Sequence, residues 1–457
     1  MSWMPSSAVD ASAREMAGSA MGGDVSALWP SPARLRVWGV RSAASLVDQA
    51  LTSGVGLAVN LLLARWMTAS LYGAFAVTFA GFLFFAGFHN VLLLEPLSVI
   101  GPARYGDGLR AYFRTQLTLH IVLVGALSLL GLLAGAALWR VLPASPLVGP
   151  VLGGALMLPF LLLLWLVRRM CYVLQRPAAA VAGSAFYIVF VIAGMLALRA
   201  AGTISGFSAF LLMGIGAFLA SGVVVFQLRA MLRGAPQDAR LRWQSVLREN
   251  WTYGRWLVGS TVLYSASNQI QIFLLPAFLG LGAAGILRAM QLPSLVMTQA
   301  ITATGLLVLP SLACDFGLGA ITRMRHKVVL TSCALAGLAV FFALLLLFLA
   351  GPTERLLFGG KFAGFAWLIP VLALGPAVTA MSMGCSMALR ASQKPHFDLI
   401  ANAIAAPIGL LTAICFMRWW GIGGAAVSMV VSFAAASVVA CLSYRFVFAK
   451  KIHESAV

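Results

Sequence analysis

The chain has 457 residues, of which 61% are hydrophobic and only 9% are charged, and its mean hydropathy is +0.96. Ordinary soluble domains carry about 25% charged residues, so this composition excludes a typical soluble protein. The sequence instead predicts an integral membrane protein, in which each helix that crosses the bilayer needs about 20 mostly apolar residues.

The first 35 residues are rich in Ser, Ala, Gly and Met and lack the apolar run of a signal peptide. We expect residues 1–35 to form a disordered cytoplasmic tail. Twelve apolar segments follow, with cores at 43–64, 74–100, 116–139, 147–167, 178–198, 207–227, 256–280, 286–310, 328–350, 365–389, 399–417 and 422–447. Transmembrane β-barrels show short segments of alternating polarity instead. The pattern therefore predicts an all-α integral membrane protein with twelve transmembrane helices.

The longest connection between these segments divides them into two groups of six. We predict an N-terminal six-helix bundle at 36–227, a basic cytoplasmic linker at 228–255, a C-terminal six-helix bundle at 256–447 and a cytoplasmic tail at 448–457. Because no loop is long enough for a folded soluble domain, the function is expected to be carried out by the helices within the membrane.

Two sequence echoes relate the halves. CYVLQRP ends at Pro177 and RASQKP ends at Pro395, 218 residues later, while Gly73 and Gly285 occupy similar stretches 212 residues apart. Each echo is weak alone, since Pro and Gly mark loops anyway, but the two offsets agree. They predict a parallel internal repeat of two bundles with a central cavity between them.

The formal charge of +19 is distributed unevenly. If the N-terminus is cytoplasmic, 24 of the 31 Lys and Arg fall on the cytoplasmic side. This bias follows the positive-inside rule and argues against nucleic-acid binding, and part of it is suited to anionic membrane lipids. Both termini are therefore predicted to be cytoplasmic.

No motif for enzymatic chemistry stands out. The six Cys residues are scattered without a CxxC pair, which favours helix packing over a metal site or a disulfide framework. Walker A and zincin motifs are absent from the sequence, as is a credible Ser/His/Asp set. We therefore expect neither an enzyme nor a cofactor.

Polar residues gather on one face of three predicted helices. On the first helix they are Arg41, Ser45, Asp48, Gln49, Thr52, Ser53, Gly56 and Asn60; on the seventh, Ser260, Thr261, Tyr264, Ser265, Asn268 and Gln271; on the eighth, Arg288, Gln291, Thr298, Gln299 and Thr302. One alternative is hydrogen bonding between packed helices. Three such faces favour a water-filled cavity between the bundles, because unsatisfied polar groups in hydrocarbon are costly. The residues expected to line a substrate cavity are Arg41, Asp48, Gln49, Thr52, Asn60, Arg65, Asn268, Gln271, Arg288, Gln291 and Gln299.

Asp48 and Glu95 are candidates for ion coupling or gating. Asp48 lies near the start of its predicted helix, where the positive end of the helix dipole favours a carboxylate. For Glu95 the alternative is an interfacial pair with Arg104 or Arg110. The pattern leaves function and structural pairing open at both positions.

Two further kinds of residue have competing interpretations. His89 stands alone on its predicted helix face and is expected to be packed or hydrogen-bonded. Arg65 and Arg288 are either ordinary snorkelling anchors or groups that attract an anionic substrate. Arg288 is the better candidate, because it lies on a polar face.

Several stretches resemble a known family. The runs DQALTSGVGLAVNLLLARWMTASLYGAF (48–75), LLLEPLSVIGP (92–102), YGRWLVGSTVLYSASNQ (253–269), GAAGILRAMQ (282–291) and LLFGGKFAGFAWLIPVLALGP (356–376) are similar to Wzx-type polysaccharide flippases of the multidrug/oligosaccharidyl-lipid/polysaccharide exporter superfamily. The resemblance extends from about residue 36 to 447. It rests on the order and spacing of the stretches, since no single motif is diagnostic.

The resemblance implies a flippase of the bacterial inner membrane. Its substrate would be an oligosaccharide repeat unit on undecaprenyl diphosphate, moved to the periplasmic face by alternating access and coupled to a proton or sodium gradient, with a polysaccharide polymerase complex as a further candidate partner. The residues that match recurrent family positions are Asp48, Gln49, Asn60, Arg65, Glu95 and Arg288. Related lipid II flippases have fourteen helices, so a count of twelve argues against that branch.

Three alternatives remain at this point. A multidrug or cation antiporter of the same superfamily calls for membrane carboxylates, which are few here. A polysaccharide polymerase or ligase would need a sizeable outer loop, and the largest, 351–364, carries only Glu354, Arg355 and Lys361. A scaffold for polysaccharide assembly would give no reason for three polar faces.

Overall fold

The computed structural model describes residues 32–106, 108–233, 241–392, 394 and 396–454. Most of the predicted tail at 1–35 lies outside the described residues, and residues 32–35 belong to the first helix. The side chain of Arg41 is also outside the description, although its backbone is helical.

The described residues form helices, turns and bends without a β-strand. The first half contains α2 (Pro32–Trp66), α3 (Ala69–His89), the π-helical turn η2 (Asn90–Leu94), α4 (Glu95–Arg104), α5 (Leu109–Val141), α6 (Val148–Val173), α7 (Pro177–Ala200) and α8 (Gly206–Arg233). The second half contains α9 (Trp243–Leu279), α10 (Leu281–Gly317), α11 (Ile321–Phe348), α12 (Ala350–Phe358), the 3-10 turn η3 (Ala363–Phe365), α13 (Leu368–Ala391) and α14 (His396–Glu454).

In the part of the chain that the structure describes, eleven helical segments are long and apolar enough to cross a membrane. The last of them, His396–Phe448, has 53 residues, far more than one crossing needs. Its backbone leaves the helical conformation at Gly421, where φ is 57° and ψ is −130°, angles that a residue without a Cβ adopts readily. The break divides this segment into two spans. The prediction of an all-α membrane protein with twelve spans is thus confirmed.

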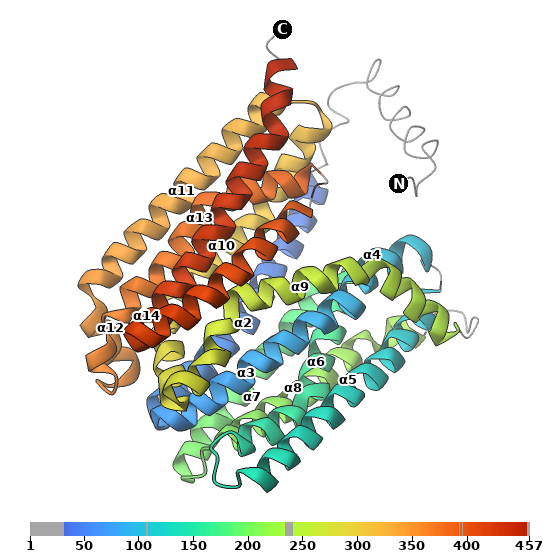
Figure 1. Cartoon of the computed structure of the whole chain (residues 1–457). Helices are drawn as coiled ribbons and strands as arrows, with labels where there is room; N and C mark the ends of the chain where they lie inside the picture. Colours follow the sequence, from blue (N-terminus) through green and yellow to red (C-terminus); the bar gives the residue numbers. More distant parts are fainter. Residues whose placement is uncertain (1–31, 107, 234–240, 393, 395, 455–457) are drawn as a thin grey trace, which may run out of the picture.

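The spans form two bundles of six, one from each half of the chain (Figure 1). Helices α2 to α8 make up the N-terminal bundle, and α9 to α14 make up the C-terminal bundle. Figure 1 shows the bundles approaching each other near α12 and diverging toward α4 and the end of α14. We call these two ends of the molecule the α12 end and the α4 end. If the predicted central cavity lies between the bundles, it would open toward the α4 end.

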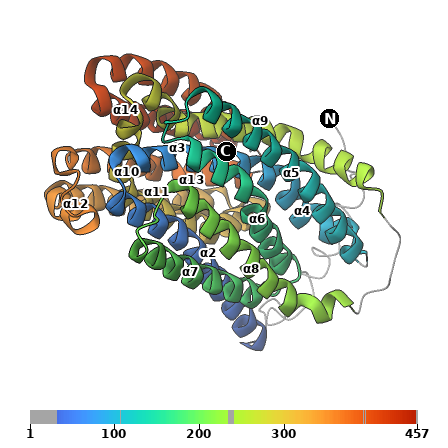
Figure 2. The ribbon, with the colours of Figure 1, turned by 90° about the horizontal axis from the view of Figure 1, so that it is seen from below.

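The bundles touch backbone to backbone where α3 crosses α10 (Figure 2). A Cβ added to Gly73 would lie 1.8 Å from the carbonyl oxygen of Leu281, and one added to Gly285 would lie 2.2 Å from the carbonyl oxygen of Ala69. Both glycines therefore permit an approach that no larger residue allows. The two glycines that echo each other in the sequence meet at the contact between the repeats.

The second echo has a structural counterpart as well. In the turn after α6, the backbone N–H of Arg176 donates to the carbonyl of Cys171 at 2.8 Å. In the turn after α13, Lys394 N–H donates to the carbonyl of Leu389 at 2.9 Å. Each residue of the second bond lies 218 positions after its counterpart in the first, so the two halves end these helices in the same way.

Two basic side chains join the bundles at the α12 end. Lys361 Nζ, in the turn after α12, donates to the carbonyl oxygen of Ala64 in α2 at 3.1 Å. Arg65 Nη1, also in α2, donates to the carbonyl oxygen of Leu356 in α12 at 3.1 Å. The two bonds run in opposite directions across the junction, and we refer to them as the α12 latch.

Most of the described part of the predicted linker at 228–255 is helical, because α8 extends to Arg233 and α9 begins at Trp243, with 241–242 as non-helical residues just before α9. The first turns of α9 pack on the N-terminal bundle. Glu249 forms an ion pair with Arg104 at 3.1 Å, and Asn250 Nδ2 donates to Gln116 Oε1 at 3.2 Å. Helix α9 thus contacts both bundles, and the exact domain boundaries stay a prediction.

Replacing Gly73 with Ala should destabilise the protein by about 1–3 kcal/mol, because the new methyl group overpacks a backbone contact that cannot recede. The matched control is Gly81→Ala, on the same helix, where an added Cβ meets nothing within 4 Å. The control should be neutral or gain up to about 1 kcal/mol from helix propensity. Thermal unfolding in detergent measures both. Equal midpoints for the two variants would contradict the close contact.

Candidate functional site: the polar face of α2 and the junction between the bundles

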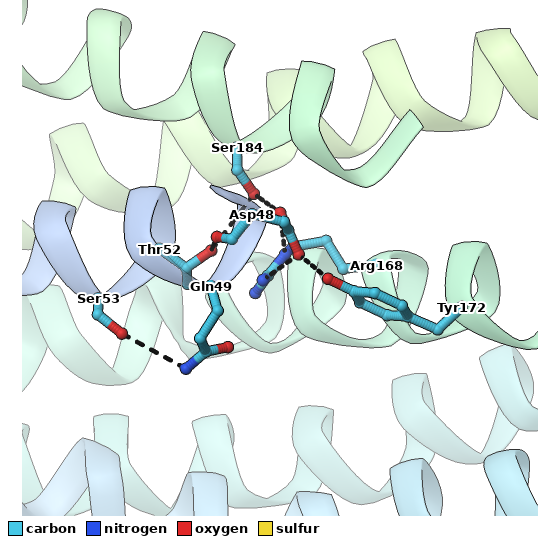
Figure 3. Close-up of polar contacts among 7 residues, drawn as sticks. All are labelled: Asp48, Gln49, Thr52, Ser53, Arg168, Tyr172 and Ser184. Carbon is cyan, nitrogen blue, oxygen red and sulfur yellow. Dashed lines mark hydrogen bonds and ion pairs between the residues drawn. The ribbon is translucent and has the colours of Figure 1, made fainter. Parts of the chain in front are cut away.

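The polar face of α2 is divided between two environments (Figure 3). Asp48 and Thr52 point into the N-terminal bundle, where Thr52 Oγ1 lies 3.3 Å from Ser184 Oγ of α7. Gln49 and Ser53 point away from that cluster, and both side chains reach the surface in part. The single polar arc expected from the sequence therefore serves two sites.

Asp48 is fully buried and holds a two-bonded ion pair with Arg168 of α6. Arg168 Nε donates to Asp48 Oδ1 at 3.2 Å and Nη2 donates to Oδ2 at 2.6 Å. Ser184 Oγ donates to Oδ1 at 2.5 Å, and the Tyr172 hydroxyl donates to Oδ2. Each carboxylate oxygen thus accepts two hydrogen bonds, which is the arrangement that compensates a buried charge.

The helix dipole does not explain Asp48, so that expectation is wrong. Helix α2 begins at Pro32, well before Asp48, and the dipole effect is limited to the first turn. The Arg168 guanidinium stabilises the carboxylate instead. The ion pair fastens α2 to α6, while Ser184 fastens it to α7.

Glu95, the second candidate for ion coupling, is half-buried at the start of α4. Its Oε1 accepts from Asn90 Nδ2 at 3.0 Å, and Asn90 Oδ1 accepts from Arg169 Nη2 at 3.3 Å. The alternative pairing of Glu95 with Arg104 is wrong, because Arg104 forms an ion pair with Glu249 of α9 instead. Asn90 therefore bridges Glu95 to a neighbouring cation.

His89 is not alone, contrary to the sequence-based interpretation. Its Nε2 lies 3.0 Å from Nδ1 of His120 in α5, and both imidazoles are buried. The sequence could not pair them, because the partner lies 31 positions away on another helix. The expectation that His89 is hydrogen-bonded is confirmed.

Two of the expected cavity residues meet across the junction between the bundles. Gln49 Nε2 donates to Ser53 Oγ, and Ser53 Oγ donates to Gln299 Oε1 of α10, each at 3.4 Å. The Gln49 and Gln299 side chains are exposed. These three residues form a polar connection between the first helix of one bundle and the second helix of the other.

Arg288 lies deeper in the junction, on α10 close to α3. Its Nη1 donates to Gln291 Oε1 at 2.9 Å, and its guanidinium interacts electrostatically with Tyr72. The Tyr72 hydroxyl donates to Asn60 Oδ1 of α2 at 3.2 Å. Within the described residues, no carboxylate forms an ion pair with Arg288. The structure thus groups Asn60, Arg288 and Gln291 around Tyr72.

The remaining predicted residues lie elsewhere. Arg65 belongs to the α12 latch, and Asn268 Nδ2 donates to the carbonyl of Tyr264 in its own helix at 2.7 Å. Gln271 is fully buried, and neither amide atom has a hydrogen-bond partner among the described residues. Arg41 lies in α2, with its side chain outside the description.

Sequence reasoning missed the partners that surround the two carboxylates. They are Asn90, Arg168, Arg169, Tyr172 and Ser184. A signal was present in WLVRRMCYV, where Arg168 and Tyr172 are four residues apart and share one helix face. The apolar core at 147–167 ends just before Arg168 and Arg169, which makes them look like cytoplasmic loop charges, whereas α6 continues to Val173 and buries Arg168.

No family model matches the chain, and no curated protein matches it in sequence. Several solved structures share its fold. An inward-facing multidrug resistance MATE family transporter of the MOP superfamily has a TM-score of 0.72 at 13% identity, covering 90% of this chain and 98% of the other. The lipid II flippase MurJ, in an inward closed conformation, has a TM-score of 0.69 at 14% identity, covering 88% and 87%.

A third structure is a MOP superfamily transporter from Pyrococcus furiosus, described as having a binding pocket of reverse polarity that suggests a different function. It has a TM-score of 0.60 at 15% identity and covers 90% of this chain and 95% of that one. At these identities the likeness establishes the fold alone. The chain is a multi-pass membrane protein with the fold of these transporters.

Breaking the buried ion pair from either side should cost about 3–5 kcal/mol, because the remaining charge is left without compensation. Asp48→Asn and Arg168→Gln are therefore each expected to lower the thermal unfolding midpoint strongly, whereas the double variant should lose less than the sum of the two. Gln49→Ala, beside Asp48 but exposed, is the control and should stay within about 0.5 kcal/mol of the wild type. Additive losses in the double variant would argue against the pairing.

Proposed function

We propose that the protein is a flippase that translocates undecaprenyl-diphosphate-linked oligosaccharide repeat units by alternating access. The substrate would move from the cytoplasmic to the periplasmic face of the bacterial inner membrane, driven by a proton or sodium gradient, and would supply surface polysaccharide or exopolysaccharide synthesis. The charge bias of the loops supports a cytoplasmic α4 end, because the α4 end carries most of the Lys and Arg.

The distribution of charge around the junction carries the proposal. Asp48 points into the N-terminal bundle and is held by Arg168, while the half-buried Glu95 is held by Asn90, which also accepts from Arg169. Arg288, at the contact of α10 with α3, has no such acidic partner among the described side chains. Apart from the two cations of the α12 latch, the described part of the junction around Arg288 therefore offers one cation and a set of amides and hydroxyls.

This chemistry suits a diphosphate head group. A guanidinium can donate two parallel hydrogen bonds to phosphate oxygens, and such charge-assisted bonds are about twice as strong as neutral ones. The amides of Gln49, Gln291 and Gln299 offer both donors and acceptors to sugar hydroxyls. The diverging bundles would leave room for a lipid tail to remain in the bilayer beside the head group.

A cationic drug is a poorer match for the same surface. It would be attracted by a carboxylate, and both candidate carboxylates in the N-terminal spans are already engaged, Asp48 by Arg168 and Glu95 by Asn90. It would also be repelled by Arg288. The likeness to a multidrug transporter reflects the fold and gives no support to a cationic substrate at this junction.

Arg288→Ala should abolish most flipping, because one charge-assisted hydrogen bond to phosphate contributes about 1.5–3 kcal/mol, or roughly 10- to 100-fold in rate. In a strain that lacks the gene, lipid-linked repeat units should accumulate on the cytoplasmic face. The wild-type gene should clear them and Arg288→Ala should not, while Arg288→Lys should fall between. The readout is the fraction of lipid-linked sugar accessible to glycosidase added outside spheroplasts.

Arg140→Ala is the matched control, since Arg140 is exposed near the outer end of α5, away from α10. It should clear the lipid-linked sugars like the wild type. Normal clearing by Arg288→Ala would refute the role of Arg288. Repeat units that reach the periplasmic face but remain unpolymerised in the deletion strain would refute the flippase proposal and favour a role in polymerisation.

A further inference from the structure

The His89–His120 pair lies in the interior of the N-terminal bundle. His89, at the end of α3, and His120, in α5, are 1% and 2% exposed. Their rings are nearly perpendicular, with Nε2 of His89 3.0 Å from Nδ1 of His120. A hydrogen bond between two imidazoles requires one nitrogen to carry a proton and the other to accept it.

The surroundings fix which nitrogen carries the proton. Nε2 of His120 lies 3.2 Å from the carbonyl oxygen of Pro159, which can only accept, so this nitrogen is the donor. In the neutral ring Nδ1 of His120 is then an acceptor, and Nε2–H of His89 donates to it. When both imidazoles are neutral, the remaining nitrogen, Nδ1 of His89, therefore carries a lone pair.

That last nitrogen is buried without a hydrogen-bond partner among the described residues. An unsatisfied buried polar atom costs about 1–3 kcal/mol. Pro159 lies inside α6 and lacks the N–H that would bond the carbonyl of Ala155. The histidine pair is not needed to satisfy that carbonyl, because Ser128 Oγ donates to it at 2.7 Å. Nδ1 of His89 is therefore an open proton acceptor that helix packing does not explain.

Among the described residues, neither imidazole forms an ion pair. The charged groups and tyrosines on the elements around the pair are Tyr72 in α3, Glu95 and Arg104 in α4, Arg110, Tyr112, Arg114 and Arg140 in α5, Arg168, Arg169 and Tyr172 in α6, and Arg248, Glu249, Tyr253, Arg255 and Tyr264 in α9, together with Asp48 in α2, which is paired with α6. Of the acids, Asp48 and Glu249 are held in ion pairs and Glu95 by Asn90. A proton on Nδ1 would thus create a buried charge without compensation, which this conformation disfavours.

The pair adjoins a segment that packs against the other bundle. The π-helical turn η2 begins at the residue after His89, and such turns are frequent at functional sites. A Cβ on Gly254 of α9 would lie 3.0 Å from the carbonyl oxygen of Val91 in η2, and one on Gly87 would lie 2.7 Å from Thr261 Cγ2 of α9. A shift of this segment would therefore be transmitted to the first helix of the C-terminal bundle.

We propose that the His89–His120 pair is a proton-binding site whose occupancy is linked to the relative position of the two bundles. The neutral pair stabilises the conformation in which the α12 end is closed, and the protonated pair favours one in which the bundles have moved. The use of this linkage for transport rests on the proposed function. A tenfold difference in proton affinity between two conformations shifts their ratio by up to about tenfold.

Hydrogen–deuterium exchange of the protein in nanodiscs, between pH 8 and pH 5 and corrected for intrinsic exchange, tests the linkage without substrate. Peptides that cover residues 64–66 and 354–362 should exchange faster as the pH falls. His89→Gln should lose this response, because the amide Nε2–H keeps the bond to His120 but Nδ1 is gone. His326→Gln, which changes an exposed histidine in the second turn of α11, should keep it.

A wild-type protein without a pH response, or a double variant His89→Gln/His120→Gln with the wild-type response, would overturn the proposal. If His89→Gln does not fold, 15N-histidine NMR of a chain whose other three histidines are replaced by Gln decides the question. Signals from the pair that do not change between pH 8 and pH 5 would also overturn it. Because no substrate is present, a different substrate leaves these results unchanged, and a failed His pair leaves the Arg288 assay unchanged.

Discussion

The ion pair between Asp48 and Arg168 determines how the rest of the site is built. By fastening α2 to α6 deep inside the N-terminal bundle, it fixes the rotation of α2 about its own axis. This rotation places Gln49 and Ser53 toward α10. A carboxylate in the membrane is thereby removed from the junction, and the charge that remains there belongs to Arg288. Helix α2 thus carries both a structural polar residue, Asp48, and polar residues that face the junction, Gln49 and Ser53. The buried Asp48–Arg168 pair determines which of them faces which side.

The contact between the two bundles depends on glycines, unlike the ion pair, which acts within one bundle. Gly73 and Gly285 let the backbones of α3 and α10 touch, so the two halves are closest at one small area near the α12 end. Elsewhere, α9 is held to the N-terminal bundle by Glu249 and Asn250 near the α4 end. A helix attached to one bundle at its start and belonging to the other at its end must bend if the bundles move relative to each other.

The sequence was sufficient for the fold because hydrophobic length determines spans, and even the paired glycines were visible as an echo. Gly421 was harder to interpret, yet the predicted boundary between 399–417 and 422–447 falls on it. The site was only partly predictable. A helical wheel gives the face of a residue but not its partner, so Asp48 and Gln49 were placed together although they serve different neighbours. The spacing of Arg168 and Tyr172 shows that they share a helix face, but it does not show that Asp48 lies opposite them, and no short pattern links His89 to His120. Such partners are set by packing between helices.

The α12 latch has an unusual choice of acceptors. Lys361 and Arg65 both donate to main-chain carbonyls, those of Ala64 and Leu356, rather than to acidic side chains. A main-chain carbonyl does not take up a proton between pH 5 and pH 8, so a fall in pH does not act on the latch acceptors directly, as it would on the carboxylate of Asp or Glu. Any response of the latch to pH must therefore come from a group elsewhere in the fold. The acceptors also survive substitution of their own residues, since every amino acid brings the same carbonyl. A side-chain substitution of Arg65 or Lys361 therefore removes a bond of the latch directly, whereas one of Ala64 or Leu356 leaves the acceptor carbonyl in place.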